Sequence, residues 1–192
     1  MPIKKKRVSP RQKMINLMYL VLMAMLALNV SSDVLNGFSL VSDGLNKSTE
    51  NANQVNQGIY AEFEQQMKSN PAKVKQWYDK AQYVRSISDS LYNLSEELKL
   101  AIVRESDGKD GDVNNIRNRE DLEASTQVML APSKGRGNEL YNRINSFREQ
   151  IVKMVTDEKK RDIISSNLST ELPQKAQLLG KNWQEYMFEN MT

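Results

Sequence analysis

The chain has 192 residues, of which 39% are hydrophobic and 27% are charged, enough for one or two domains with an apolar core. It contains no cysteine and no histidine, which excludes disulfides, thiolate nucleophiles and the most common general base. An enzymatic site would have to be built from carboxylates, hydroxyls, lysine or arginine. We therefore expect a protein that is not an enzyme, with no catalytic residues, no metal site and no cofactor.

The positive charge is concentrated at the N-terminus. Residues 1–13 hold six lysines and arginines and no acidic residue, so the remainder of the chain is slightly acidic although the net charge is +3. Because no Lys/Arg cluster lies on the body, we expect no nucleic-acid partner. Beside an apolar segment, a basic tail favours attraction to anionic lipid headgroups.

One segment is long and apolar enough to predict a transmembrane helix. Residues 14–32 carry no formal charge and consist mainly of Leu, Met, Val and Ala. Such a helix would be about 28 Å long, close to the ~30 Å hydrocarbon core of a bilayer. The basic residues before it and Asp33 after it predict a cytoplasmic tail over residues 1–13 and an exported body over residues 33–192. Tyr19 suits the membrane interface.

A cleaved signal peptide is the alternative for this segment. The apolar run is longer than a usual signal-peptide core. Ala27-Leu28-Asn29 does not fit a cleavage site, and Val30-Ser31-Ser32 fits it poorly, so a retained anchor is favoured. Within the predicted span, small residues recur on one stripe that would let two helices approach closely. These residues are Ala24, Ala27 and Ser31.

After the predicted span, apolar residues recur at alternating spacings of four and three, which is typical of a heptad seam. The seam comprises Val34, Phe38, Val41, Leu45, Ala52, Val55 and Ile59, with Ser48 as its weak point. No proline or turn cluster interrupts the chain between Arg11 and Ser69, which predicts one long helix that leaves the membrane without a break or with a slight bend at Gly37 or Gly44. Its glycines weaken it, so packing must stabilise it.

Ser69-Asn70-Pro71 predicts a helix end followed by a new helix, because proline is favoured at the first helical position. The second helix should run to about Arg104 and lie antiparallel to the first. Further helices are predicted over 120–130, 138–155, 158–168 and 183–191, with an irregular stretch over 173–180. The predicted fold class is therefore all-α, a transmembrane helix that continues into an up-and-down helical bundle.

An acidic loop has a spacing that partly fits a calcium-binding EF-hand. Asp110, Asp112 and Asn114 alternate, and Asp121 stands where the twelfth ligand would be. The sixth position is Asn115 in place of glycine, and the twelfth is Asp in place of Glu. A solvated loop is the favoured interpretation.

Two other motifs are interpreted as structural. Residues 134–137 (KGRG) lack the Lys-Ser/Thr ending of a phosphate loop and predict a turn. Trp183, Tyr186 and Phe188 are predicted to be core or interface aromatics.

Arg11 lies within a turn of the predicted span. It could extend to lipid headgroups, or it could pair with a carboxylate of another transmembrane helix and lower the pKa of that carboxylate. Residues 14–32 contain no carboxylate. If the protein takes part in proton-driven work, the proton-carrying group must therefore belong to a partner.

The residues around the predicted span resemble a known family. Residues 9–19 (SPRQKMINLMY) and 27–35 (ALNVSSDVL) are very similar to the start of the GldM/PorM family, the single-span motor subunit of Bacteroidota gliding motility and type IX secretion. The similarity continues at residues 137–140, 166–173 and 183–191.

The resemblance implies a homodimer in the inner membrane, with its two transmembrane helices inside a ring of the two-span partner GldL/PorL. Proton flow through the ring would turn this subunit, and its helical periplasmic domain would transmit the motion. In the family, residues at the positions of Arg11 and Tyr19 lie near an essential membrane Glu of the partner, which favours the pairing role of Arg11. Family members continue into β-rich domains that reach outer-membrane components, and we expect those domains to be missing from this chain.

The predicted function is therefore a proton-motive-force-coupled motor subunit. The alternative is a membrane tether or sensor that is not energised.

Overall fold

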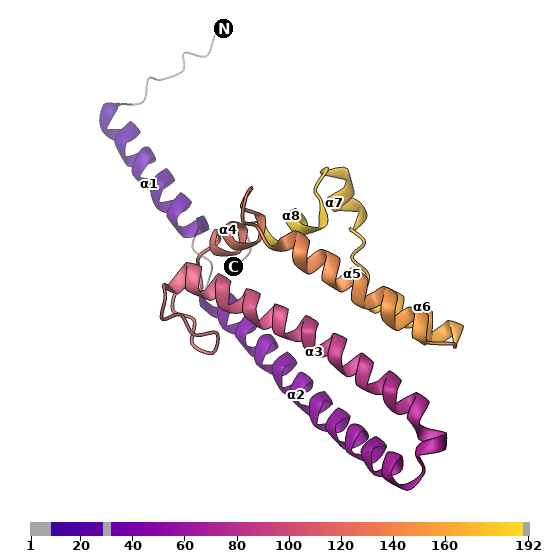
Figure 1. Ribbon diagram of the computed structural model, residues 1–192. Helices are drawn as coiled ribbons and strands as arrows, with labels where there is room; N and C mark the ends of the chain where they lie inside the picture. Colours follow the sequence, from indigo (N-terminus) through magenta and orange to yellow (C-terminus); the bar gives the residue numbers. More distant parts are fainter. Residues whose placement is uncertain (1–8, 29–31, 190–192) are drawn as a thin grey trace. The chain divides into compact units, whose positions relative to one another are not determined.

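A computed structural model describes residues 9–28 and 32–189 (Figure 1). The chain divides into two units, Met1–Ala52 and Asn53–Thr192, and each is described here by itself. Every regular element within the described ranges is an α-helix. The predicted all-α fold class is confirmed.

The first unit contains α1 (Pro10–Leu28) and the first part of α2 (Ser32–Ser69). Ser9 caps the start of α1, because its hydroxyl oxygen accepts a hydrogen bond from the backbone N–H of Gln12 at 3.3 Å. Proline, which is favoured at the first helical position, follows it. Residues 29–31 lie outside the described ranges, so the predicted continuity of one helix across them stays a prediction. Among the described helices, none is both long enough and apolar enough to cross a membrane.

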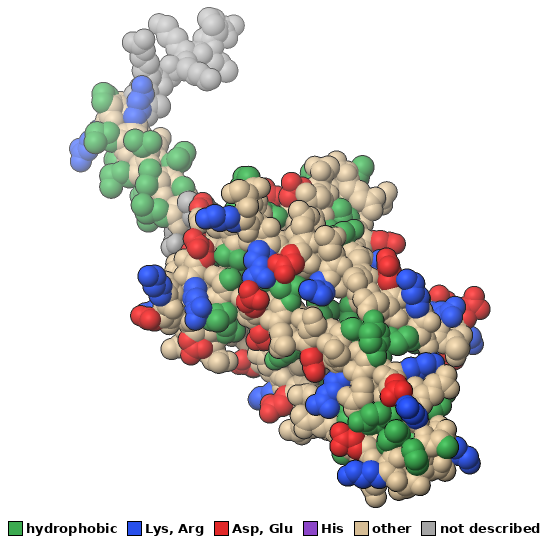
Figure 2. Space-filling model, viewed as in Figure 1, with side chains coloured by type: hydrophobic (Ala, Val, Ile, Leu, Met, Phe, Trp, Pro, Cys, Tyr) green, Lys and Arg blue, Asp and Glu red, His purple; other side chains and the backbone are tan. Residues whose placement is uncertain are grey.

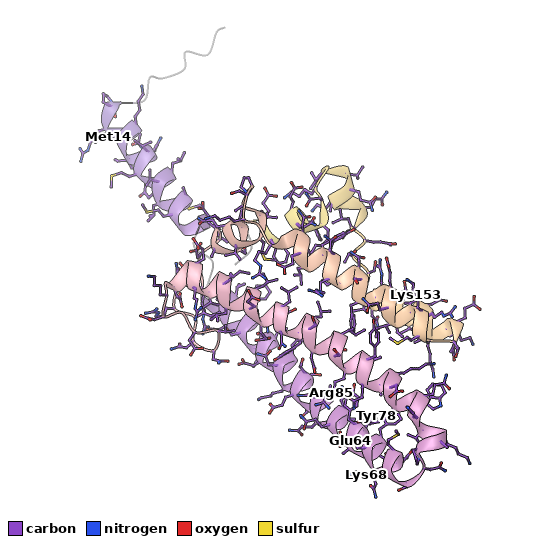
Figure 3. The ribbon with its side chains drawn as sticks, in the orientation of Figure 1. Met14, Glu64, Lys68, Tyr78, Arg85 and Lys153 are labelled. Carbon is purple, nitrogen blue, oxygen red and sulfur yellow. The ribbon has the colours of Figure 1, made fainter. Side chains whose placement is uncertain are left out.

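In the second unit, the last part of α2 and α3 (Pro71–Asp107) form an antiparallel pair (Figure 1). The helix end at Ser69 and the restart at Pro71 are confirmed. The guanidinium carbon of Arg85 on α3 lies 5.1 Å from the ring centroid of Tyr60 on α2, a cation–π contact that joins the two helices. Figure 3 shows Arg85 between the two ribbons, near the end of α2 that carries Glu64 and Lys68.

The remaining helices of this unit are α4 (Ala124–Leu130), α5 (Gly137–Met154), α6 (Glu158–Asn167), α7 (Gln174–Leu178) and α8 (Trp183–Phe188). They confirm that the segments 120–130, 138–155, 158–168 and 183–191 contain helices, as predicted. Residues 190 and 191, at the end of the last predicted helix, lie outside the described ranges.

The irregular stretch predicted over 173–180 was wrong in part, because it contains α7. Pro173 starts this helix: its carbonyl oxygen accepts hydrogen bonds from the backbone N–H groups of Ala176 at 2.9 Å and Gln177 at 3.2 Å. Ala176 is fully buried, which holds the short helix against the rest of the unit.

The core of the second unit forms where α3, α4, α5 and α8 meet. Its buried centre is Leu94 and Leu98 of α3 with Met129 of α4. The partly buried side chains packed against it are Ile102, Val128, Leu130, Leu140 and Phe188. Full burial of each such side chain contributes about 1.5–3 kcal/mol, so this small cluster supplies much of the cohesion of the unit.

The segment between α4 and α5 is a tight turn, as predicted for residues 134–137. A Cβ on Gly137 would lie 2.8 Å from the carbonyl oxygen of Met129, so only glycine fits there without a shift of the backbone. The guanidinium of Arg136 donates to Glu139 at 2.8 Å and to Glu97 of α3 at 2.6 Å. The hydrogen bond from Arg136 lowers the pKa of the Glu139 carboxyl below its ordinary value. Arg136 thereby joins α3 to the start of α5.

Replacing the most deeply buried leucine of the core should destabilise the second unit. Leu98 is 3% exposed, and Leu98→Ala leaves a cavity that should lower the free energy of unfolding by about 2–5 kcal/mol. Leu178 is 82% exposed, so Leu178→Ala should change it by less than about 0.5 kcal/mol. Urea unfolding followed by tryptophan fluorescence measures both. Equal effects of the two variants would contradict the assigned core.

Candidate functional site

The apolar side chains of α1 are exposed around the whole helix. From Met14 to Met25 the large apolar side chains are 38% to 71% exposed, and they include every position from Leu17 to Met23. Figure 2 shows them as a concentration of hydrophobic atoms over α1. A helix that is apolar all round requires an apolar environment on every side. Within the described part of the first unit, no element covers these side chains.

The predicted partner-facing residues of α1 are both exposed. Arg11 lies in the first turn, and Tyr19 is 63% exposed about 12 Å further along the helix axis. Ala24 is also exposed. Ala27 lies in α1 where side chains are not described, and Ser31 lies outside the described ranges. The predicted stripe of small residues therefore stays a prediction.

The heptad seam lies on exposed positions of α2. Val34, Phe38, Val41, Leu45, Val55 and Ile59 are 47% to 66% exposed, and Ala52 is exposed as well. The side of α2 roughly opposite the seam carries polar and charged residues such as Asp43 and Glu50. The seam is therefore an ordered apolar stripe on an otherwise polar helix.

The last turns of α2 behave differently. Tyr60, Phe63 and Met67 are half-buried, and they lie on the side where Arg85 of α3 contacts Tyr60. This side is rotated by about a quarter of a turn from the line through Val55 and Ile59. Within the second unit, α2 thus uses one face for α3 and leaves the seam face uncovered.

Two segments that are distant in sequence are hydrogen-bonded to α5. The side-chain amide of Gln184 donates to Asn138 Oδ1 at 2.7 Å, which joins α8 to the start of α5. The hydroxyl of buried Thr170 donates to Asn145 Oδ1 at 3.0 Å, which joins the segment after α6 to the middle of α5. Residues 166–173 and 183–188 are therefore both held to α5 by side-chain hydrogen bonds.

The C-terminal aromatics serve packing. The ring centroid of Trp183 lies 5.5 Å from that of Tyr141 and 5.9 Å from that of Phe188. Trp183 and Phe188 are half-buried and pack on neighbouring rings, as predicted for packing aromatics, whereas Tyr186 is 43% exposed.

The acidic loop does not assemble the EF-hand arrangement that its spacing partly fits. Asp112 Oδ1 accepts a hydrogen bond from the backbone N–H of Asn114, and Asp121 Oδ1 accepts from those of Glu123 and Ala124. Within the described ranges, no three acidic side chains gather in a way that could hold a metal ion. These carboxylates stabilise turns of the loop.

Asp107, which the sequence did not single out, anchors this loop. Its carboxylate accepts hydrogen bonds from the backbone N–H groups of Arg117 at 2.7 Å and Asn118 at 2.8 Å. These two bonds, aided by the charge of Arg117, hold the pKa of the Asp107 carboxyl below its ordinary value against the opposing effect of desolvation. The loop is thus fastened to the end of α3.

A family model described as the GldM N-terminal domain matches residues 33–191. The chain belongs to the GldM family. The resemblance inferred from the sequence motifs is therefore confirmed. A search of curated proteins gave no match.

Membership of the GldM family supports, in general terms, a role as a subunit of the gliding and type IX secretion motor. Proteins of this family are associated with that machinery at the inner membrane, and they are structural subunits rather than classical enzymes. The predicted seam and the motifs around α5 lie inside the matched range. Arg11 and Tyr19 lie before it.

The carboxylate of Asp107 should make the stability of the loop depend on pH in the acid range. Folding lowers the pKa of the Asp107 carboxyl, so the ionised carboxylate stabilises the folded state at pH values above its unfolded pKa of about 3.8. This stabilisation is lost as the pH falls from that value through the lower pKa of the folded state. Asp107→Asn should therefore unfold at lower urea than the wild type at pH 6, and the difference should shrink at low pH. Asp110→Asn, in the same loop, is the matched control. A difference between Asp107→Asn and wild type that is the same at both pH values would contradict this role.

Proposed function

We propose that this GldM-family chain is a proton-motive-force-coupled motor subunit that drives type IX protein secretion and gliding motility. It works as a homodimer whose transmembrane helices lie inside a ring of the two-span partner GldL/PorL, and its helical domain transmits motion through the periplasm. The observation that carries the proposal is the heptad seam on α2, whose large apolar side chains are exposed in the part of the chain that the structure describes.

A second copy of the chain is the occupant that suits this seam. Apolar residues at alternating spacings of three and four are the pattern by which two helices pair along a common axis. A symmetric pair places the same stripe on both partners, so each seam buries the other. The resulting paired helix is stiff, which is what a part that transmits motion requires.

The N-terminal segment is proposed to anchor the protein in the inner membrane. Residues 14–32 cross the bilayer, residues 1–13 lie in the cytoplasm and residues 33–192 lie in the periplasm. Support comes from the uncharged run, the basic tail before it and the apolar side chains exposed around α1. Ala24, Ala27 and Ser31 would let the two helices of the dimer pack closely.

Arg11 and Tyr19 are proposed to face a carboxylate of the ring. An ionised carboxylate at membrane depth is costly, and a guanidinium beside it stabilises the charged form. Protonation removes that attraction and releases the contact. Alternate pairing and release around the ring would couple proton passage to movement of the dimer.

Replacing Arg11 should abolish coupling without preventing insertion. Arg11→Ala removes the cation that pairs with the ring, so secretion of a reporter cargo and gliding should both stop. Lys13→Ala is the matched control, since it removes a neighbouring positive charge, and it should retain both activities. Membrane fractionation measures insertion of each variant. Secretion at the normal rate in Arg11→Ala would contradict the proposed pairing.

The absence of native cysteine allows the seam to be tested by single-cysteine cross-linking in membranes. Phe38→Cys, Leu45→Cys and Val55→Cys place thiols on the seam, and a disulfide between two copies forms only if the Cβ atoms approach within about 4.5 Å. These three variants should give covalent dimers on oxidation.

Asp43→Cys and Gln54→Cys, roughly on the opposite side of α2, are the controls and should remain monomeric. Equal cross-linking on both sides, or none on the seam, would rule out the seam as the dimer interface.

A further inference from the structure

A cleft of about 630 Å³ lies in the second unit, bordered by α5, the Thr170–Leu172 segment and the residues around α7 and α8. Its volume is in the range of sites for small organic ligands, which is about 300–1,000 Å³. Most such sites are lined by apolar side chains, whereas six carboxamide side chains border this one. They are Asn138, Asn142, Asn145, Gln177, Asn182 and Gln184.

Internal hydrogen bonds hold several of these carboxamides by one end only. Gln184 Nε2 donates to Asn138 Oδ1, Gln177 Nε2 donates to the carbonyl oxygen of Leu172, and Asn182 Oδ1 accepts from the backbone N–H of Glu185. Among the residues that the structure describes, the ends that remain free are the acceptors Oε1 of Gln177 and Gln184, the donors Nδ2 of Asn138 and Asn182, and both ends of Asn142. Asn145 is engaged at both ends, because its Nδ2 donates to the carbonyl oxygen of Tyr141 and its Oδ1 accepts from Arg148 and Thr170. The cleft therefore presents donors and acceptors that are already oriented.

Two aromatic side chains border the same cleft. Tyr141 of α5 and Trp183 of α8 contact each other at 5.5 Å between ring centroids, and both are half-buried. Their rings are held in place by packing, so they offer a fixed apolar surface beside the amides.

The cleft carries one positive and one negative side chain, and the positive one already donates a hydrogen bond within the protein. The two ionisable side chains with opposite charge at its border are Arg148 and Glu171, and Arg148 Nη2 donates to Asn145 Oδ1 at 2.7 Å. A strongly anionic or cationic ligand would therefore find no net countercharge. The chemistry favours a neutral ligand that is rich in groups acting as both donor and acceptor and that has an apolar side.

We infer that this cleft binds a short neutral saccharide, preferentially one that carries acetamido groups. Sugar hydroxyls both donate and accept, and an acetamido group presents an N–H and a C=O that match the free ends of the carboxamides. The acetamido methyl group packs on the Trp183 and Tyr141 rings. An extended peptide that adds a strand would instead require an open strand edge, and the described elements that border the cleft are helices and loops. The inference does not depend on the proposed motor role.

The test uses the full chain in lipid nanodiscs, because maltoside detergents carry a sugar headgroup that would compete. The chain has two tryptophans, so Trp77→Phe leaves Trp183 as the single tryptophan, which is excited selectively at wavelengths that tyrosine does not absorb. Titration with tri-N-acetylchitotriose should change the Trp183 emission saturably, and cellotriose, which lacks acetamido groups, should bind more weakly. A proline-rich peptide should produce no change.

Two variants examine the carboxamides. Asn142→Ala and Gln184→Leu, each in the Trp77→Phe background, should weaken binding of tri-N-acetylchitotriose by about three- to tenfold, the effect of losing one neutral hydrogen bond. Gln127→Leu changes an exposed carboxamide of α4 outside the cleft and is the control. It should bind tri-N-acetylchitotriose with the same affinity as the parent. Asn142 is exposed, so its variant keeps the test valid if Gln184→Leu does not fold.

Three results would overturn the inference. These are an unchanged Trp183 emission with both saccharides at millimolar concentration, a response to the peptide alone, and equal affinity of both carboxamide variants and the parent.

Discussion

The structure depends on the two apolar faces of α2, of which the second unit covers only one. Tyr60, Phe63 and Met67 lie on the side where α3 packs, and the cation–π contact with Arg85 reinforces that side. Val55 and Ile59 lie about a quarter of a turn away and are exposed. The heptad seam has seven apolar residues at alternating spacings of four and three, and they are exposed. Such a surface is suited to association with another helix. The proposal of a dimer starts from this constraint.

The second unit provides a fixed base for that helix. Leu94, Leu98 and Met129 form its buried centre, and Arg136 links α3 to α5 through Glu97 and Glu139. Two segments that are distant in sequence, the one after α6 and α8, are fastened to α5 by polar contacts and aromatic packing. Transmission of motion by the proposed motor requires this combination of a stiff helix and a cohesive body.

Local sequence rules predicted most of the helices, because their signals are local. Pro71 after a capping residue identified the break between α2 and α3, and the spacing of apolar residues identified α5. The helix α7 was missed because Pro173 and Gly180 are typical of irregular chain, and the burial of Ala176 that stabilises it is a tertiary effect. Asp107 was missed because its partners Arg117 and Asn118 are ten and eleven residues away. The seam was predictable from spacing alone, whereas the cleft beside α5 depends on side chains brought together only by folding.

The most direct test of the proposed motor is native mass spectrometry of the affinity-tagged chain, released gently from its own membrane. We expect two copies of this chain, held together with several copies of a small two-span membrane protein that carries a carboxylate inside one span. That composition is what a paired helix inside a ring requires. A homodimer that is stable in mild detergents without any such partner would contradict the motor and leave a membrane tether as the explanation of the seam.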